Sequence, residues 1–331
     1  MALDLFFYIL LAVLGVFLIL KGSEWVTDSV SHVARHFSTS SVAVGLLLVS
    51  TMLSLPEIAV AVSAVLQDHP QIGLGALLGS VIVNLGLIVG VCTLIRPLRV
   101  SRVILLRDLV FMIVASIIVA ALALQDGNLS QVDGFVFLLL FIPYMVNVYE
   151  QEKQLSKAEV KKEGLQMVNT LELIGKLGVG NFRIRDGLGV FVLGGLLLIV
   201  GADFFTRGLV FFAESFHLPD LVVGITLGAL GPSIPNLAAA VQATRAGMEE
   251  LAISETIGSN VFTLLVSIGI LALVHPFTLE STSRFITLPT LLLISFTFMF
   301  FTIKGHIGRR EGMVLLGMYF LSVFAEILFR L

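Results

Sequence analysis

Residues 50–57 of this 331-residue chain are STMLSLPE, and residues 229–236 are ALGPSIPN. A shift of 179 positions relates the two stretches, because Ser54 then falls on Ser233 and Pro56 on Pro235. The gapless register continues in both directions, through the pairs Gly22/Gly201, Glu24/Asp203, Gly45/Gly224, Gly79/Gly258, Ser80/Ser259, Gly90/Gly269 and Pro97/Pro276. Most matched residues are Gly, Ser and Pro, which shape the backbone rather than fill a core, so the pattern favours a duplicated site.

The composition places the chain among polytopic membrane proteins. Hydrophobic residues make up 57% of it and charged residues 13%, with a mean hydropathy of +1.03. Soluble globular domains have about 45–50% apolar and about 25% charged residues. The net charge of −3, without a basic patch interleaved with aromatic residues, gives no indication of nucleic-acid binding. Cys92 is the only cysteine, which excludes an intramolecular disulfide and a thiolate zinc cluster.

The apolar runs predict an all-α fold. A membrane-spanning helix needs about 20 mostly apolar residues. Ten such spans are predicted, over residues 4–22, 41–66, 71–95, 103–124, 132–149, 187–209, 219–244, 250–274, 286–303 and 311–329. The first and sixth can extend to about His36 and Phe216 as long tilted helices. Five spans fall in residues 1–149 and five in residues 187–331, so each repeat is a five-helix unit.

The polar segment 150–186 joins the two units, and we expect it to be a cytoplasmic linker with at most a short surface helix. With this linker in the cytoplasm, 17 of the 20 Lys and Arg residues lie inside, and only Arg207, Arg284 and Arg330 lie outside. This positive-inside bias places the N-terminus of a multi-pass cell-membrane protein outside. Five spans per unit then invert one repeat relative to the other, an arrangement typical of secondary transporters that work by alternating access.

Span two carries the sharpest functional signal, Pro56 followed by Glu57. A proline within a helix lacks an N–H and leaves the carbonyl four residues earlier unpaired, so we expect helices two and seven to be broken at Pro56 and Pro235. The freed carbonyls belong to Met52 and Gly231, and in hydrocarbon a bound cation can satisfy them. Glu57 lies near mid-depth, where a carboxylate costs about 2.5–3.5 kcal/mol to insert and marks a functional site by default. The alternative is a Glu hydrogen-bonded to a neighbouring helix.

Other side-chain oxygens complete a predicted cation cage around Glu57. Its other members are Ser54, Ser80, Asn84, Ser233, Asn236, Ser259 and Thr263. Ser80 and Asn84, like Ser259 and Thr263, are four residues apart on one helix face, and hard cations prefer oxygen ligands of these kinds. The alternative is that these side chains only hydrogen-bond helices together.

Further acids are less clearly placed. Glu255, one turn before Ser259, is either the second carboxylate of a divalent-cation site or an acid at the rim of span eight. Glu24 and Asp203 are expected as helix-end or gating acids, and Glu326 as an exposed terminal acid. Enzyme and nucleotide motifs are missing, so no cofactor is expected, and transport would run on an ion gradient.

The two repeats resemble the alpha repeats of the cation/calcium exchanger superfamily, whose motifs are G-T-S-[LI]-P-[ED] and G-S-N-x-x-[ND]. The counterparts here are residues 52–57 and 79–84, then 231–236 and 258–263. The resemblance implies ten helices, two facing acids, overlapping calcium and sodium sites, sliding of helices one and six, and function as a single chain in the lipid bilayer.

The chain departs from this pattern at several motif positions, one of which removes a charge. Leu53 and Pro232 replace the motif Thr, and Asn236 replaces the second acid. The leading hypothesis is an antiporter that moves calcium or a related metal cation against sodium or protons. A transporter of the same fold for a monovalent cation, magnesium or another divalent metal, and a non-transporting membrane receptor or scaffold, stay open; an intramembrane enzyme is remote.

Overall fold

A computed structural model describes residues 2–36, 42–125, 127–153, 188–279 and 283–329. The fold is all-α, with ten membrane-spanning helical segments as two inverted five-helix repeats. Nine of these segments are long and apolar enough to cross a bilayer over their described residues, and the tenth contributes the apolar stretch Thr51–Leu66. The predicted linker lies almost wholly outside the described residues, so the unit boundaries and any linker helix stay predictions.

The helices have nearly the predicted bounds. The first repeat contains α1 (Ala2–His36), α2 (Val42–Leu66), α3 (Pro70–Ile82) with η1 (Val83–Ile88) and α4 (Val89–Ile95), α5 (Arg102–Ile104) with η2 (Leu105–Leu109) and α6 (Val110–Gln125), and α7 (Gln131–Lys153). The second contains α9 (Leu188–Ser215), α10 (Asp220–Val223) with η3 (Gly224–Gly228) and α11 (Ala229–Arg245), α12 (Glu249–Phe262) with η4 (Thr263–Ser267) and α13 (Ile268–Val274), η5 (Ser283–Thr287) with α14 (Leu288–Thr302), and α15 (Arg309–Leu328). Segments labelled η are π-helical turns.

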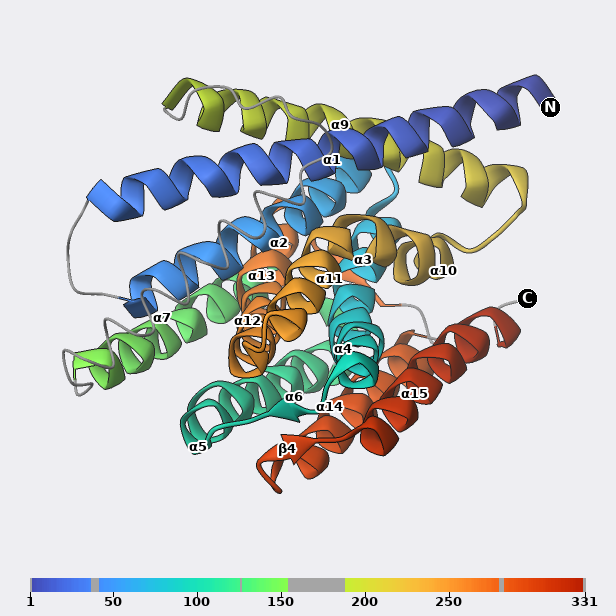
Figure 1. Ribbon diagram of the computed structural model, residues 1–331. Coiled ribbons are helices and arrows are strands. Elements are labelled where there is room, and N and C mark those ends of the chain that lie inside the picture. The colour runs from blue at the N-terminus through green and yellow to red at the C-terminus, as the bar shows by residue number, and fades with distance from the viewer. Residues whose placement is uncertain (1, 37–41, 126, 154–187, 280–282, 330–331) are drawn as a thin grey trace.

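Helices α1 and α9 lie side by side and run in opposite directions across one face of the bundle (Figure 1). Their contact repeats itself about a pseudo-two-fold axis, because Gly15 faces Gly201 and Gly22 faces Gly194. A Cβ added at Gly15 would lie 2.5 Å from the Phe205 nitrogen, and one at Gly201 would lie 2.8 Å from the Gly15 oxygen. Only glycine allows this backbone approach, which explains why the repeat register preserves it.

Two short strand pairs show the same symmetry. β1 (Leu98–Arg99) pairs antiparallel with β4 (His306–Ile307), and β2 (Asn128–Leu129) pairs with β3 (Phe277–Thr278). Each pair joins a connection in one repeat to a connection in the other. The two repeats are therefore interlocked at both ends of the bundle.

The proline-containing helices differ in detail from the expected breaks. Pro56 lies inside the continuous helix α2, and Pro232 and Pro235 lie inside α11. A proline removes only its own N–H, so the hydrogen bonds on either side can continue. The irregular backbone of span seven is instead the π-helical turn η3, at Gly224–Gly228.

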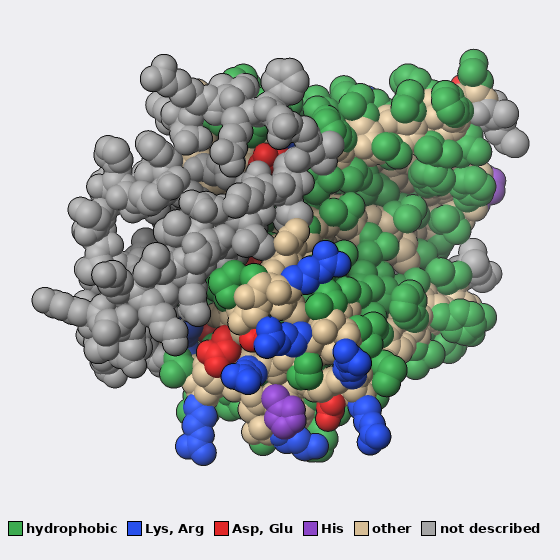
Figure 2. Space-filling view, viewed as in Figure 1, with side chains coloured by type: hydrophobic (Ala, Val, Ile, Leu, Met, Phe, Trp, Pro, Cys, Tyr) green, Lys and Arg blue, Asp and Glu red, His purple; other side chains and the backbone are tan. Residues whose placement is uncertain are grey.

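Charged side chains gather at one end of the molecule, whereas its flank is apolar (Figure 2). We name as the basic end the end at which α4–α5, α11–α12 and α14–α15 connect. Its cations are Arg96, Arg99, Arg102, Arg245, Lys304, Arg309 and Arg310. An ion pair of 2.7 Å between Arg96 and Glu249 ties α4 to α12 there. Exposed Leu, Val, Ile and Phe side chains cover α1, α7, α9, α14 and α15, as a bilayer-facing surface requires.

Candidate cation site

Six of the predicted side chains form one buried hydrogen-bonded network where α2, α3, α11 and α12 meet. They are Ser54, Glu57, Ser80, Ser233, Asn236 and Ser259, and none is more than 2% exposed. Glycines beside the serines allow this meeting: a Cβ at Gly79 would lie 2.6 Å from the Ile225 oxygen. The sequence motif thus places small residues where helices cross and oxygens in the space between them.

One carboxylate oxygen of Glu57 collects three donors. Its Oε1 accepts from Ser80 Oγ at 2.6 Å, from Asn236 Nδ2 at 3.2 Å and from Ser233 Oγ at 3.3 Å. All three donors are neutral, so no cationic side chain among the described residues pairs with Glu57.

The network follows the pseudo-two-fold axis of the fold. Glu57 contacts Asn236, its own counterpart in the second repeat. The hydroxyls of Ser54 and Ser259 are 3.0 Å apart, and those of the equivalent Ser233 and Ser80 are 3.3 Å apart. Charge breaks this symmetry, because only one of the two central positions is an acid.

Several buried oxygens around the network have no hydrogen-bond donor. They are Glu57 Oε2, Asn84 Oδ1, Asn236 Oδ1, Thr263 Oγ1 and both carboxylate oxygens of Glu255. Buried polar atoms are almost always partnered, so such a cluster needs an explanation. Carboxylate, amide and hydroxyl oxygens are the ligands that hard cations take. Within the described residues no cluster of three or more His, Cys, Asp or Glu exists, so a cation here would rely on neutral oxygens.

The structure adds Asn260 to the predicted residues. Its Oδ1 accepts from Asn84 Nδ2 at 2.8 Å, and its own Nδ2 lies 3.7 Å from Met112 Sδ. Asn260 is fully buried and follows Ser259 directly in the Gly-Ser-Asn sequence, which is the signal that could have identified it. The bond from Asn84 to Asn260 also orients Asn84, because it commits the amide nitrogen and leaves Oδ1 free.

The predicted backbone ligands, Met52 and Gly231, belong to α2 and α11. Met52 is partly buried and packs with Leu55 on the cluster that faces α1 and α9. Gly231 is buried and faces the ring of Phe205 on α9. Pro56 and Pro235 cannot donate to these two carbonyls, and their service as ligands stays a proposal.

Three acids, Glu24, Asp203 and Glu326, do not lie where the sequence predicts them. Glu24 and Asp203 lie within α1 and α9 rather than at helix ends, and their expected role in gating stays a prediction. Glu24 pairs with Lys21 at 2.8 Å, and Asp203 accepts from Arg207 at 2.8 Å and from Gln67 at 3.1 Å. Each acid therefore has a polar or basic partner that allows it to lie within a long helix.

Glu326 is not an exposed terminal acid. It is 1% exposed and accepts from Thr287 Oγ1 at 2.5 Å. Glu255 is only 6% exposed. This burial removes the interpretation of Glu255 as an acid at the rim of its span.

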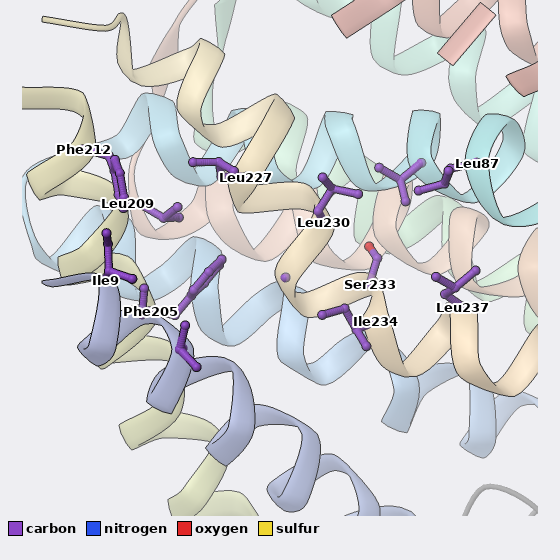
Figure 3. Close-up of a pocket in the computed structure, with 14 residues that line it drawn as sticks. Ile9, Leu87, Phe205, Leu209, Phe212, Leu227, Leu230, Ser233, Ile234 and Leu237 are labelled. Atoms are coloured by element: carbon purple, nitrogen blue, oxygen red, sulfur yellow. The ribbon is translucent and has the colours of Figure 1, made fainter. Parts of the chain in front are cut away.

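An apolar cavity of about 480 Å³ reaches the network from the side of α1 and α9. It is lined by segments of α1, η1, α9, η3 and α11, and Ser233 supplies its only polar side chain. Figure 3 shows Ser233 at its inner wall, with Phe205 and Ile9 across the space. The α1–α9 pair therefore does not close tightly against α11 at the level of the site.

Comparison with known proteins gives a consistent result. The family model for sodium/calcium exchanger protein matches residues 7–150 and 187–328. The chain is 32% identical to the sodium/calcium exchanger MaX1 of Methanosarcina acetivorans, over 97% of this chain and 98% of that protein. It is 28% identical to the inner membrane protein YrbG of Escherichia coli, over 93% of each.

A solved structure shows the same architecture. It is that of the sodium-calcium exchanger NCX_Mj soaked with Na⁺ and Sr²⁺, which aligns over 96% of this chain and 97% of its own with a TM-score of 0.64 and 25% identity. These matches confirm the resemblance seen in the repeats. The chain belongs to the sodium/calcium exchanger family.

Proposed function

We propose that this protein is a secondary active cation antiporter that moves calcium, or a related metal cation, against sodium or protons. The observation that carries the proposal is the Glu57 carboxyl, which is fully buried, has one oxygen without a donor, and lies among neutral oxygens. An ionised carboxylate is rarely buried without a cationic partner. The transported cation is that partner.

The ligand set follows from the orphaned oxygens and the network. We assign Glu57 as the central ligand. The other ligands are Ser54, Ser80, Asn84, Ser233, Asn236, Ser259, Thr263 and the carbonyls of Met52 and Gly231, and Glu255 supplies a second negative charge near this cage. On cation binding, Ser80 and Ser233 would turn their lone pairs toward the ion, because a hydroxyl can donate or accept. The same hydroxyls thus donate to Glu57 when the site is empty and coordinate the cation when the site is occupied.

Access would switch through the α1–α9 pair. The reciprocal glycine contacts hold these helices together as one unit, and the apolar cavity leaves room between this unit and α11. Sliding of the pair would expose the site first at one end of the bundle and then at the other, as inverted repeats permit.

Orientation follows from the basic end. Lys21 is buried within α1 in an ion pair, so it is no longer counted among the 17 cytoplasmic Lys and Arg residues. The count becomes 16 cytoplasmic and 3 external cations. This bias still favours a cytoplasmic basic end and linker, with the N-terminus outside.

Charge supports one specific alternative, a monovalent substrate. Asn236, which faces Glu57 across the axis, is neutral and donates to it. One carboxylate and a monovalent cation sum to zero, whereas a divalent cation needs a second negative charge close by. The substrate class therefore depends on the ionisation of the other acid near the site.

Cation flux in proteoliposomes tests the proposal. Calcium uptake driven by an imposed sodium or proton gradient is expected, and Glu57→Gln should abolish it while the exposed Glu250→Gln on α12 leaves it intact. Flux of sodium, potassium or magnesium alone would support the altered-substrate alternative. If no cation moves through the wild-type protein, the antiporter proposal is wrong and a receptor or scaffold remains.

A further inference from the structure

Glu255 is a buried carboxylate that the central network does not use. It lies on α12, one helical turn from Ser259 on the same face, and is 6% exposed. Neither carboxylate oxygen has a hydrogen-bond partner. In contrast, Glu57 accepts three bonds, so the two acids have different environments.

The groups around Glu255 place it between the central network and the basic end. Along α12 it lies between Glu249 in the first turn of the helix and Ser259 of the central network. Helix α4, which carries the buried Cys92, packs against α11. Arg96, one turn beyond Cys92, pairs with Glu249 in the first turn of α12. Along α4 and α12 the order is therefore central network, Glu255, ion pair and surface.

The other repeat has no such acid. The position equivalent to Glu255 is Ala76, which packs in an apolar cluster with Val60, Ile72 and Phe205. A carboxylate at only one of two equivalent positions is not required by the fold, since the alanine version packs without it. Its burial without a donor is unfavourable unless a cation or a proton accompanies it.

We propose that Glu255 forms a second cation position, separate from the Glu57 network and closer to the basic end. It would hold the transported metal cation, a hard ion that takes carboxylate oxygens, on its way between Glu57 and that end. The ion pair of Arg96 and Glu249 would close the passage beyond it. This inference rests on the proposed cation transport, because it places a station on the same pathway.

Strontium soaked into crystals of the full chain gives a direct test, because anomalous density locates the ion. Two peaks are expected in the wild type, one in contact with the Glu57 carboxylate and one in contact with the Glu255 carboxylate. Glu255→Gln should remove the second peak and keep the first. Glu250→Gln, an equal charge change on the same helix, should keep both. Glu255→Ala, which copies Ala76 of the other repeat, provides a second variant with no carboxylate if the amide packs poorly.

Transport kinetics in proteoliposomes of defined orientation provide the second measurement. With strontium supplied from the basic end, Glu255→Gln should raise KM at least tenfold, and with strontium supplied from the opposite end the KM should change less than twofold. A single peak at Glu57 in the wild type would overturn the inference and leave the antiporter proposal standing. An equal rise of KM from both ends would also overturn it, because Glu255 would then belong to the central cage. Absence of density at both acids, together with absence of flux, would remove the proposed function itself.

Discussion

Asn236→Asp tests the charge logic of the site with one isosteric change. In the structure, Asn236 Nδ2 donates to Glu57 Oε1 at 3.2 Å, and both residues are buried. Aspartate has the same shape but replaces this donor with an acceptor. The variant therefore exchanges an attractive contact for two facing carboxylates, which is the charge pattern that the family motif implies.

The size of the effect follows from the distance. Two unit charges 3.2 Å apart repel by about 5 kcal/mol at an effective dielectric constant of about 20. Without a divalent ion the pair must take up a proton or a monovalent cation, and the empty protein should lose stability. A calcium ion between two carboxylates forms a neutral site, so the repulsion becomes attraction in the bound state. Because about 1.4 kcal/mol corresponds to tenfold in binding, even a fraction of this energy should raise calcium affinity at least tenfold relative to sodium.

Thermal unfolding of the purified protein, with and without calcium, measures both parts of this prediction. The midpoint of the ion-free variant should lie below that of the wild type. The same calcium concentration should raise it by a larger increment, since a ligand that binds more tightly stabilises the folded state more. Calcium titration calorimetry in competition with sodium gives the selectivity directly. Asn128→Asp, which adds the same charge at an exposed position in β2, is the control. A variant with wild-type selectivity and an unchanged ion-free midpoint would refute the reasoning.

Two further changes probe the network and the helix contact. Ser80→Ala removes the 2.6 Å hydrogen bond to Glu57. A hydrogen bond to a charged group contributes about 1.5–3 kcal/mol, so the thermal unfolding midpoint without calcium should fall. An unchanged midpoint would contradict the geometry. Gly15→Ala places a Cβ 2.5 Å from the Phe205 nitrogen and should destabilise by about 1–3 kcal/mol through overpacking, outweighing the gain of about 1 kcal/mol in helix propensity. Gly195→Ala, where a Cβ meets nothing within 4 Å, should keep only that gain; equal shifts of the two midpoints in detergent would show that α1 and α9 do not pack closely.

The repeat register predicted the geometry of the site because symmetry carries information that a single motif lacks. A common offset of 179 residues joins Ser54 to Ser233 and Ser80 to Ser259. Inverted repeats related by a two-fold axis make each contact occur twice: the hydroxyls of Ser54 and Ser259 are 3.0 Å apart, and those of the equivalent Ser233 and Ser80 are 3.3 Å apart. The apolar runs predicted the membrane spans for a simpler reason, because the thickness of the hydrocarbon layer sets the length of a spanning helix.

The positions of charged residues within helices were harder to predict, because a local or distant partner allows a charge to lie inside the bundle. Lys21 and Glu24 suggested a helix end, but an ion pair three residues apart shields both within α1. Glu326 suggested exposure because its partner, Thr287, belongs to another helix and is invisible in a local window. The π-helical turns, among them η1 and η4, depend on packing between helices and have no local sequence signal.

The distribution of negative charge links the central site to the proposed second cation position at Glu255. The family motif implies two facing acids, whereas this chain has Glu57 at the centre and Glu255 on α12, one helical turn from Ser259 toward the basic end. A divalent ion held by Glu57 alone leaves one positive charge in a low-dielectric site, and an ionised Glu255 within electrostatic range offsets it without sharing the ion. The same separation gives the ion a second carboxylate to move to on one side only. On this proposal, the loss of the facing acid at Asn236 makes release asymmetric between the two ends of the bundle, and Asn236→Asp combined with Glu255→Ala should restore equal KM values from both sides.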